Sequence, residues 1–240
     1  MNPIKPAELA ADLAHIETWI FDLDNTLYPS ACNLFAQIDR RMTLFIAEQL
    51  KLEPEAARII QKAYYHSHGT TLSGLMEVHG IEPLAFLEFV HDIDLAPVAA
   101  DPALAAALSR LPGRRLVYTN GSRAHAERVL DKLGIAPLFE AVHDIVASEF
   151  QPKPRPAAYD DLVKRHGIAP KSAAMFEDIA RNLEVPHALG MTTVLISGEK
   201  PWERGEDWHP PAPPAHVHHV AEDLARFLAT ARVMSYERAP

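Results

Sequence analysis

Apolar and polar positions follow two alternating periods along the second half of the chain. Short apolar runs typical of buried strands recur there, separated by segments with a three- to four-residue apolar period. We expect strands at 116–119, 141–147, 173–176, 192–196 and 216–220, and helices at 122–133, 157–166, 183–189 and 221–228. Because strands that alternate with helices form βαβ units, the pattern predicts an α/β fold with a doubly wound, mainly parallel sheet.

One more strand precedes this region, and a long helical stretch separates the two. The strand is the apolar run Trp19–Phe21, which opens into a polar loop. Between residues 30 and 95 the apolar positions have helical spacing, with helices expected at 34–50, 54–65, 72–78 and 84–91. We therefore predict a core domain formed by residues 1–29 and 96–240, with a helical domain of residues 30–95 inserted after the first strand.

Composition narrows the class of protein. The chain has 240 residues, is 48% hydrophobic, and carries 23 Lys and Arg against 32 Asp and Glu, a formal charge of −9. This acidity opposes binding to a nucleic acid polymer or an anionic membrane. The single cysteine, Cys32, excludes an internal disulfide, and we expect it to be inert packing. Because the sequence has no signal-peptide core and no apolar run of membrane length, we expect a cytoplasmic protein. We expect it to be a monomer or a homodimer.

Polar side chains follow four of the predicted strands. They are Asp22 and Asp24; Thr119, Asn120 and Gly121; Lys153; and Glu177 and Asp178 with Asn182. A parallel sheet brings its carboxyl ends to one edge. Facing carboxylates need a cation, and hard oxygen ligands select Mg²⁺, while a lysine, a hydroxyl and backbone N–H groups suit a phosphoryl group. A carboxylate can attack phosphorus, and a second acid two residues away can protonate the leaving oxygen and then activate water.

In this order, these segments resemble the four motifs of the haloacid dehalogenase (HAD) superfamily. The segment that resembles the first motif is Phe21-Asp22-Leu23-Asp24-Asn25-Thr26-Leu27-Tyr28. Those that resemble the second, third and fourth motifs are, in order, Thr119-Asn120-Gly121, Pro152-Lys153-Pro154, and Phe176-Glu177-Asp178 with Asn182. Order and spacing agree over residues 17–197. The resemblance implies a Rossmann-type core, and the helical stretch 30–95 matches a C1-type cap of subfamily I.

The resemblance also implies roles for the motif residues. Asp22 would be the nucleophile and Asp24 the general acid and base, while Asp22, the backbone carbonyl of Asp24 and Asp178 would bind Mg²⁺. The phosphoryl oxygens would be held by Lys153 and by Thr119, Asn120 and Gly121. Many members have a Gly-Asp pair and a second Asp four residues later. Here the pair is Glu177-Asp178 and the later residue is Asn182. The two departures from the pattern, Glu177 and Asn182, are therefore candidate neighbours of the metal.

Further runs resemble the pyrimidine 5′-nucleotidase branch of the superfamily. They are Asp24–Pro29, Gly69–Leu75, His91–Asp94 and Asn182-Leu183. This implies a Mg²⁺-dependent phosphatase that hydrolyses a small phosphate monoester, a pyrimidine nucleoside 5′-monophosphate, through an aspartyl-phosphate. The alternatives are a sugar-phosphate phosphatase, a phosphosugar mutase, a dehalogenase, and a non-catalytic phosphate-sensing protein. Asp24 and Asp178 argue against the dehalogenase, because dehalogenases of the superfamily lack the second Asp.

Other side chains have two interpretations. Tyr28 either gates the pocket or packs against the cap. Four residues of the helical stretch line the mouth of the site or serve packing and solvation: Tyr64, Tyr65, His66 and His68. We expect His216, His218 and His219 to lie on a solvated edge strand, and Trp202 and Trp208 to anchor the proline-rich loop 198–214.

Overall fold

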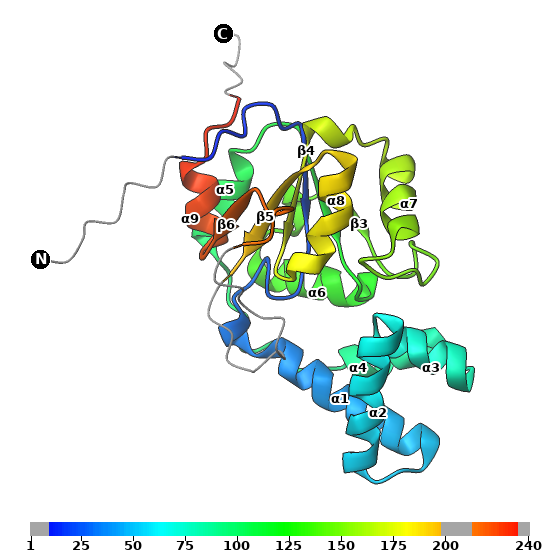
Figure 1. Ribbon diagram of the computed structural model, residues 1–240. Helices are drawn as coiled ribbons and strands as arrows, with labels where there is room; N and C mark the ends of the chain where they lie inside the picture. Colours follow the sequence, from blue (N-terminus) through cyan, green and yellow to red (C-terminus); the bar gives the residue numbers. More distant parts are fainter. Residues whose placement is uncertain (1–9, 198–212, 235–240) are drawn as a thin grey trace, which may run out of the picture.

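Six parallel strands form one sheet among residues 10–197 and 213–234, the part of the chain that the computed structural model describes (Figure 1). They are β1 (Thr18–Phe21), β2 (Arg114–Tyr118), β3 (Ala141–His143), β4 (Ala173–Glu177), β5 (Thr192–Ile196) and β6 (His219–Ala221). The strand order is β3-β2-β1-β4-β5-β6, with every neighbouring pair parallel. The predicted doubly wound α/β fold is confirmed, and β1 lies between β2 and β4.

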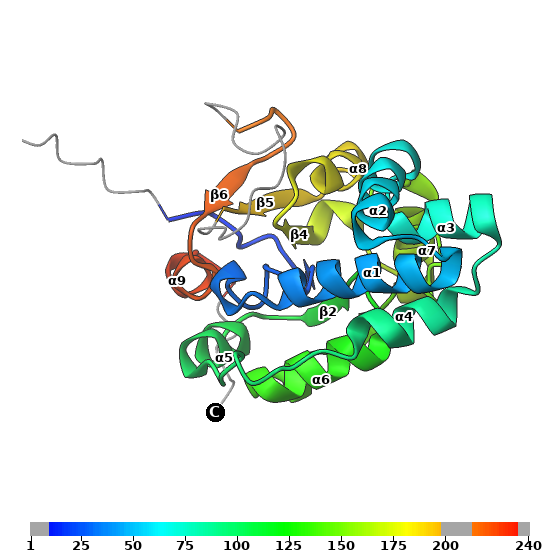
Figure 2. The same ribbon diagram turned by 90° about the horizontal axis from the view of Figure 1, so that it is seen from below.

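Helices cover both faces of the sheet (Figure 2). One face packs against α5 (Pro102–Ser109), α6 (Arg123–Leu133) and α9 (Leu224–Thr230), and the other against α7 (Pro156–His166) and α8 (Glu184–Leu189). On β1, Trp19 and Phe21 belong to the first apolar cluster, and Ile20 belongs to the second. Because strands buried on both faces need no polar side, they are short apolar runs without alternation, as the sequence pattern indicated.

The segment 30–95, all of which is described, contains four α-helices beyond the carboxyl ends of the strands (Figures 1 and 2). They are α1 (Leu34–Leu50), α2 (Pro54–His68), α3 (Thr71–His79) and α4 (Pro83–His91). Their apolar faces share a cluster of their own, which includes Phe45, Leu75 and Phe86 and also contacts Ile145 of the sheet region. The division into a core domain and a cap domain stays a prediction.

Capping residues set most helix boundaries. The side chains of Asp101 and Ser122 accept hydrogen bonds from the first turns of α5 and α6, and Gly134 ends α6 in the left-handed conformation. Proline occupies the first turn of α2, α4, α5 and α7, where its missing N–H has no helical partner in any case. None of the described helices combines the length and the apolar character needed to cross a bilayer.

Two strands, β3 and β6, differ most from their predicted limits. β3 ends at His143 because the Asp144 carboxylate accepts hydrogen bonds from the backbone N–H groups of Arg123 and Ala147, which turns the chain away from the sheet. β6 begins at His219, since the Thr193 side chain donates to the His216 carbonyl oxygen in place of a strand hydrogen bond. The predictions for Trp202 and Trp208 lie outside the described residues.

Gly113 controls the spacing between the start of β2 and the residue before β1. Its φ is +74°, and an added Cβ would lie 2.1 Å from the carbonyl oxygen of Glu17, which accepts a hydrogen bond from the Arg114 N–H at 2.9 Å. We expect Gly113→Ala to lower the free energy of unfolding by about 2–5 kcal/mol, because backbone strain and the overlap add. Urea denaturation followed by circular dichroism measures this.

Gly167 supplies the matched control for this substitution. Its φ is +59°, yet nothing lies within 4 Å of an added Cβ. Gly167→Ala should therefore show only the backbone strain, about 1–2 kcal/mol. Equal losses of stability in the two variants would contradict a steric role for Gly113.

Candidate active site

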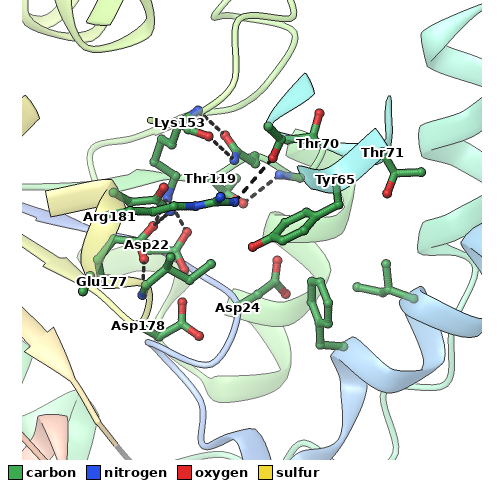
Figure 3. Close-up of a pocket in the computed structure, with 18 of the residues that line it drawn as sticks. Asp22, Asp24, Tyr65, Thr70, Thr71, Thr119, Lys153, Glu177, Asp178 and Arg181 are labelled. Atoms are coloured by element: carbon green, nitrogen blue, oxygen red, sulfur yellow. Dashed lines mark hydrogen bonds and ion pairs between the residues drawn. The ribbon is translucent and has the colours of Figure 1, made fainter. Parts of the chain in front are cut away.

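A cavity of about 1280 Å³ lies between the carboxyl ends of the strands and the helices α1, α2 and α4 (Figure 3). All nine site residues predicted from the sequence line it: Asp22, Asp24, Thr119, Asn120, Gly121, Lys153, Glu177, Asp178 and Asn182. They come from the loops after β1, β2 and β4 and from the segment that precedes α7. The folded chain therefore brings the complete predicted set to one place.

A buried lysine connects two carboxylates at the centre of the site. The Nζ atom of Lys153 donates to Asp22 Oδ1 at 2.6 Å, to Glu177 Oε1 at 2.8 Å and to the carbonyl oxygen of Tyr118 at 3.0 Å. Burial alone would lower the pKa of Lys153, but the charges and hydrogen bonds of Asp22 and Glu177 outweigh it and raise this pKa. The ammonium group stays protonated, and all three of its N–H donors are in use.

The loop after β2 holds this lysine in position. The Asn120 side chain accepts from the Lys153 backbone N–H at 2.9 Å and donates to the Lys153 carbonyl oxygen at 3.3 Å. Thr119 Oγ1 accepts from the Gly121 N–H at 2.9 Å, which fixes the turn that follows. The Asn120 side chain thus connects two loops, which leaves the Thr119 hydroxyl and the loop backbone as the candidate phosphoryl donors.

Carboxylates outnumber the positive charges next to them. Asp22, Glu177 and Asp178 are buried, and each offers an oxygen within 4.8 Å of the others. Burial raises the pKa of Asp22 well above its usual value; Lys153 opposes this, while Glu177, Asp178 and Asp24 add to it. The cluster is therefore short of positive charge, and a bound divalent cation would relieve that shortage.

The hydrogen bonds of the cluster separate the candidate metal ligands from their neighbours. Glu177 Oε1 accepts from Lys153 and from Asn182 Nδ2, the latter at 2.7 Å, and its Oε2 accepts from the Ile179 N–H at 2.8 Å. Both oxygens of Glu177 thus hold the loop. Asp22 accepts from Lys153 through Oδ1 and Asp178 accepts from Asn25 through Oδ2 at 3.4 Å, and we favour these two carboxylates as ligands of a hard cation. The buried Oδ1 of Asn182 has no hydrogen-bond partner among the described residues, which suits a bound water.

Asp24 lies in different surroundings from Asp22. Its Oδ1 accepts from the Tyr28 hydroxyl at 2.6 Å and from His125 Nε2 at 3.1 Å. Burial would raise the pKa of Asp24, but the charge of His125 and the hydrogen bonds from His125 and Tyr28 lower it to about 2. The His125 ring stacks on His91 with centroids 4.4 Å apart, so the partner of Asp24 is itself held in place.

The match to known families gives this site a context. The family model for haloacid dehalogenase-like hydrolases matches residues 16–190, which is more than half of the chain. This chain belongs to that family. The matched range includes all nine predicted site residues, from Asp22 to Asn182.

Individual relatives of this HAD-like hydrolase have several activities. "Phosphate metabolism protein 8" of Saccharomyces cerevisiae is 26% identical over 195 residues, which are 75% of this chain but only 61% of the yeast protein. The HAD phosphatase from Thermococcus onnurineus has a TM-score of 0.57 at 16% identity and covers 91% of this chain and 100% of its own. The L-2-haloacid dehalogenase PA0810 has a TM-score of 0.56 at 15% identity, with 90% and 97% covered. These structural likenesses show the fold and do not distinguish the reactions.

Three contributors to the site were missed in the sequence. For Tyr28, neither gating of the pocket nor packing against the cap included its contact with Asp24; its side chain is buried in the cluster that also contains Leu34 of α1, and its hydroxyl donates to Asp24 Oδ1. His125 and Arg181 carried no prediction, although both lie close to motif residues: His125 is four residues after Gly121, in the first turn of α6, and Arg181 directly precedes Asn182. That proximity was the available signal.

Of the four residues expected either to line the mouth of the site or to serve packing and solvation, two line the cavity and two do not. Tyr65 and His66 line the cavity, whereas the Tyr64 hydroxyl bonds His79 and His68 lies 3.9 Å from Glu77. His216 also lines the cavity, and its Nε2 lies 2.9 Å from the Ala180 carbonyl oxygen. His218 is hydrogen-bonded to Thr193 and is exposed, and of the three histidines only His219 lies on β6, the strand at the end of the sheet order.

We expect a divalent cation such as Mg²⁺ to raise the melting temperature of this HAD-like hydrolase. A ligand at 100 times its Kd stabilises the folded state by about 2.7 kcal/mol. Asp178→Asn should remove most of this gain, because it takes one charged ligand from the cluster. Differential scanning calorimetry with and without the cation measures the shift.

The control for this experiment is Asp160→Asn on α7, where the aspartate is exposed. It should keep the full gain in melting temperature, and equal behaviour of the two variants would place the cation elsewhere.

The gain in melting temperature caused by the cation should also be smaller at pH 5 than at pH 7.5. The pKa of Asp22 is raised, so protons compete with the cation for this carboxylate as the pH falls.

Proposed function

We propose that this protein is a Mg²⁺-dependent phosphatase that hydrolyses a small phosphate monoester through an aspartyl-phosphate on Asp22. The observation that carries the proposal is that Asp24 lines the same cavity as Asp22, Lys153 and Asp178. A hydrolase that displaces halide from carbon needs no acid, because halide leaves as a stable anion, whereas ester oxygen leaves as an alcohol and needs one. Asp24 therefore favours phosphate ester hydrolysis over dehalogenation.

The proposed reaction has two steps. In the first, an Asp22 oxygen bonds to phosphorus, the bond from phosphorus to the ester oxygen breaks, and Asp24 gives its proton to that oxygen. In the second, Asp24 takes a proton from a water molecule whose oxygen attacks phosphorus. The bond to Asp22 then breaks, and orthophosphate is released.

The remaining residues would stabilise charge during both steps. Thr119 and the backbone after it would donate to phosphoryl oxygens, and Lys153 would hold the Asp22 carboxylate in line. Asp22 and Asp178 would hold Mg²⁺, which supplies positive charge beside the phosphoryl group when bound. Glu177 and Asn182 would position the acidic loop through the hydrogen bond between them.

We further propose that residues 30–95 are a C1-type cap and that the substrate is a pyrimidine nucleoside 5′-monophosphate. Helices α1, α2 and α4 form the cavity wall opposite the strand ends, which is where a leaving group would lie. The cavity has room for a nucleotide and is closed on two sides, so a small molecule fits better than a polymer. The names of the yeast relative and of the Thermococcus phosphatase also support phosphate chemistry.

Phosphate release from a panel of esters tests this proposal. We expect Mg²⁺-dependent release, abolished by EDTA, with UMP, CMP and dUMP preferred over AMP, GMP and sugar phosphates. Asp22→Asn should keep the fold but reduce kcat by more than about 10⁴-fold, a loss of the size that follows removal of a catalytic nucleophile. Faster phosphate release from sugar phosphates than from nucleotides would contradict the nucleotidase proposal. No release from any ester would favour a mutase or a phosphate sensor.

Asp24→Asn tests the proton transfer. We expect kcat for CMP to fall by about 10²–10⁴-fold, since the leaving oxygen receives no proton. p-Nitrophenyl phosphate, whose leaving group needs no proton, should still phosphorylate Asp22, and the phospho-enzyme should accumulate because water is no longer activated. Mass spectrometry of the quenched protein measures it. An unchanged rate with CMP would remove Asp24 from the mechanism.

A further inference from the structure

Arg181 is a positive charge in the cavity that the proposed chemistry does not use. It lies on the short 3₁₀ turn Ala180–Leu183, three residues after Asp178, which is the residue that follows β4. Figure 3 shows its side chain extending across the cavity toward Thr70, beside Tyr65. Arg181 thus begins in the strand-end region and ends next to the helices opposite it.

Two contacts hold the guanidinium group. Its central carbon lies 4.7 Å from the centroid of the Tyr65 ring on α2, the geometry of a cation–π contact. Its Nη2 lies 3.5 Å from the carbonyl oxygen of Gly69, at the outer limit of a hydrogen bond. Tyr65 therefore helps to place the group, and among the described residues its N–H groups make only the long hydrogen bond to Gly69.

The charge on Arg181 is not neutralised within residues 10–197 and 213–234. Three Lys and Arg side chains line the cavity in that range: Lys62, Lys153 and Arg181. Lys62 is paired with Asp39 at 2.6 Å and Lys153 with Asp22 and Glu177, whereas Arg181 is in no ion pair with a described residue. Its Nε is buried and lacks any hydrogen-bond partner there. A buried donor without a partner is unfavourable by about 1–3 kcal/mol, and a ligand oxygen would remove that penalty.

The position of Arg181 indicates which part of a substrate it meets. The phosphoryl group belongs beside Asp22, Thr119 and Lys153 at the strand ends. The head of Arg181 contacts Tyr65 and Gly69, which lie in the helical segment on the leaving-group side of the cavity. A guanidinium is planar and presents a fork of N–H donors, which pairs with planar groups that carry acceptor oxygens.

We propose that Arg181, oriented by Tyr65, is the residue that selects the substrate by binding a planar, carbonyl-bearing leaving group, as in a pyrimidine base. This inference rests on the proposed phosphatase function and names the part of the site that recognises the leaving group. Arg181 lies over one face of the Tyr65 ring, so a base bound there would meet the guanidinium instead of stacking on that face. Esters whose leaving group carries hydroxyls alone lose this contact.

Kinetics with two matched substrates test the inference. CMP and ribose 5-phosphate share the phosphate and the ribose, and only CMP has the base. We expect Arg181→Met to lower kcat/KM for CMP by about 10- to 100-fold, mainly through KM, and to change ribose 5-phosphate by less than about 3-fold. Arg181→Lys, which keeps the charge but not the planar fork, should restore only part of the loss.

The control variant is Arg165→Met, whose arginine lies on α7 and pairs with Asp161 at 3.0 Å at the protein surface. It should leave both substrates unchanged. Equal losses for CMP and ribose 5-phosphate in Arg181→Met would assign Arg181 to the phosphoryl group and overturn the inference. A wild-type protein that handles CMP no better than ribose 5-phosphate would overturn it as well.

Binding separates this inference from the proposed function. If the wild-type protein releases no phosphate from either ester, the phosphatase proposal fails, and calorimetric binding to the Asp22→Asn protein with Mg²⁺ then decides the role of Arg181. We expect CMP to bind about 10-fold or more tightly than ribose 5-phosphate, and Arg181→Met in that background to remove the difference. Equal binding of the two compounds before the Arg181 substitution would overturn the inference.

Discussion

The buried ammonium group of Lys153 is the interaction on which the strand-end cluster depends. It lies between Asp22 and Glu177, two carboxylates that would otherwise place like charges together away from water. Removing one partner of such a buried set leaves an uncompensated charge, which is destabilising by about 3–5 kcal/mol. The lysine therefore determines how closely the loops after β1 and β4 approach each other, and the Asn120 side chain determines where the lysine stands.

The register of the sheet explains how one lysine reaches all three of its acceptors. Phe21 is paired with Val117 on β2 and with Phe176 on β4, so the following residues reach the edge at the same level. Those residues are Asp22, Tyr118 and Glu177, the three that accept hydrogen bonds from Lys153 Nζ. The site is thus a direct consequence of placing β1 in the middle of a parallel sheet, and a shift of one residue in either pairing would separate these acceptors.

The parts that could be predicted from the sequence depend on local signals. Buried strands such as Trp19–Phe21 are apolar runs, helix starts such as Asp101-Pro102 carry their own caps, and polar residues after the strands must gather at one edge. The parts that could not be predicted depend on how distant segments pack. His125 reaches Asp24 across 101 residues, and Arg181 reaches Gly69 across 112. Neither contact has a periodic pattern: the first is set by how α6 packs beside the loop after β1, and the second by how the helices of residues 30–95 lie over the sheet.

Asp22 and Asp24 show how two identical side chains, two residues apart, acquire different chemistry. Burial among carboxylates raises the pKa of Asp22, whereas His125 and Tyr28 overcome the effect of burial and lower the pKa of Asp24 to about 2. The proposed mechanism needs Asp22 ionised and Asp24 protonated, so both pKa shifts would have to reverse before reaction. A cation beside Asp22 would reverse the first, since positive charge favours the carboxylate. The second would reverse if Asp24 exchanged Tyr28 and His125 for the substrate oxygen. The proposed catalytic state therefore differs from this one in the partners of Asp24, while the lysine cluster needs no rearrangement.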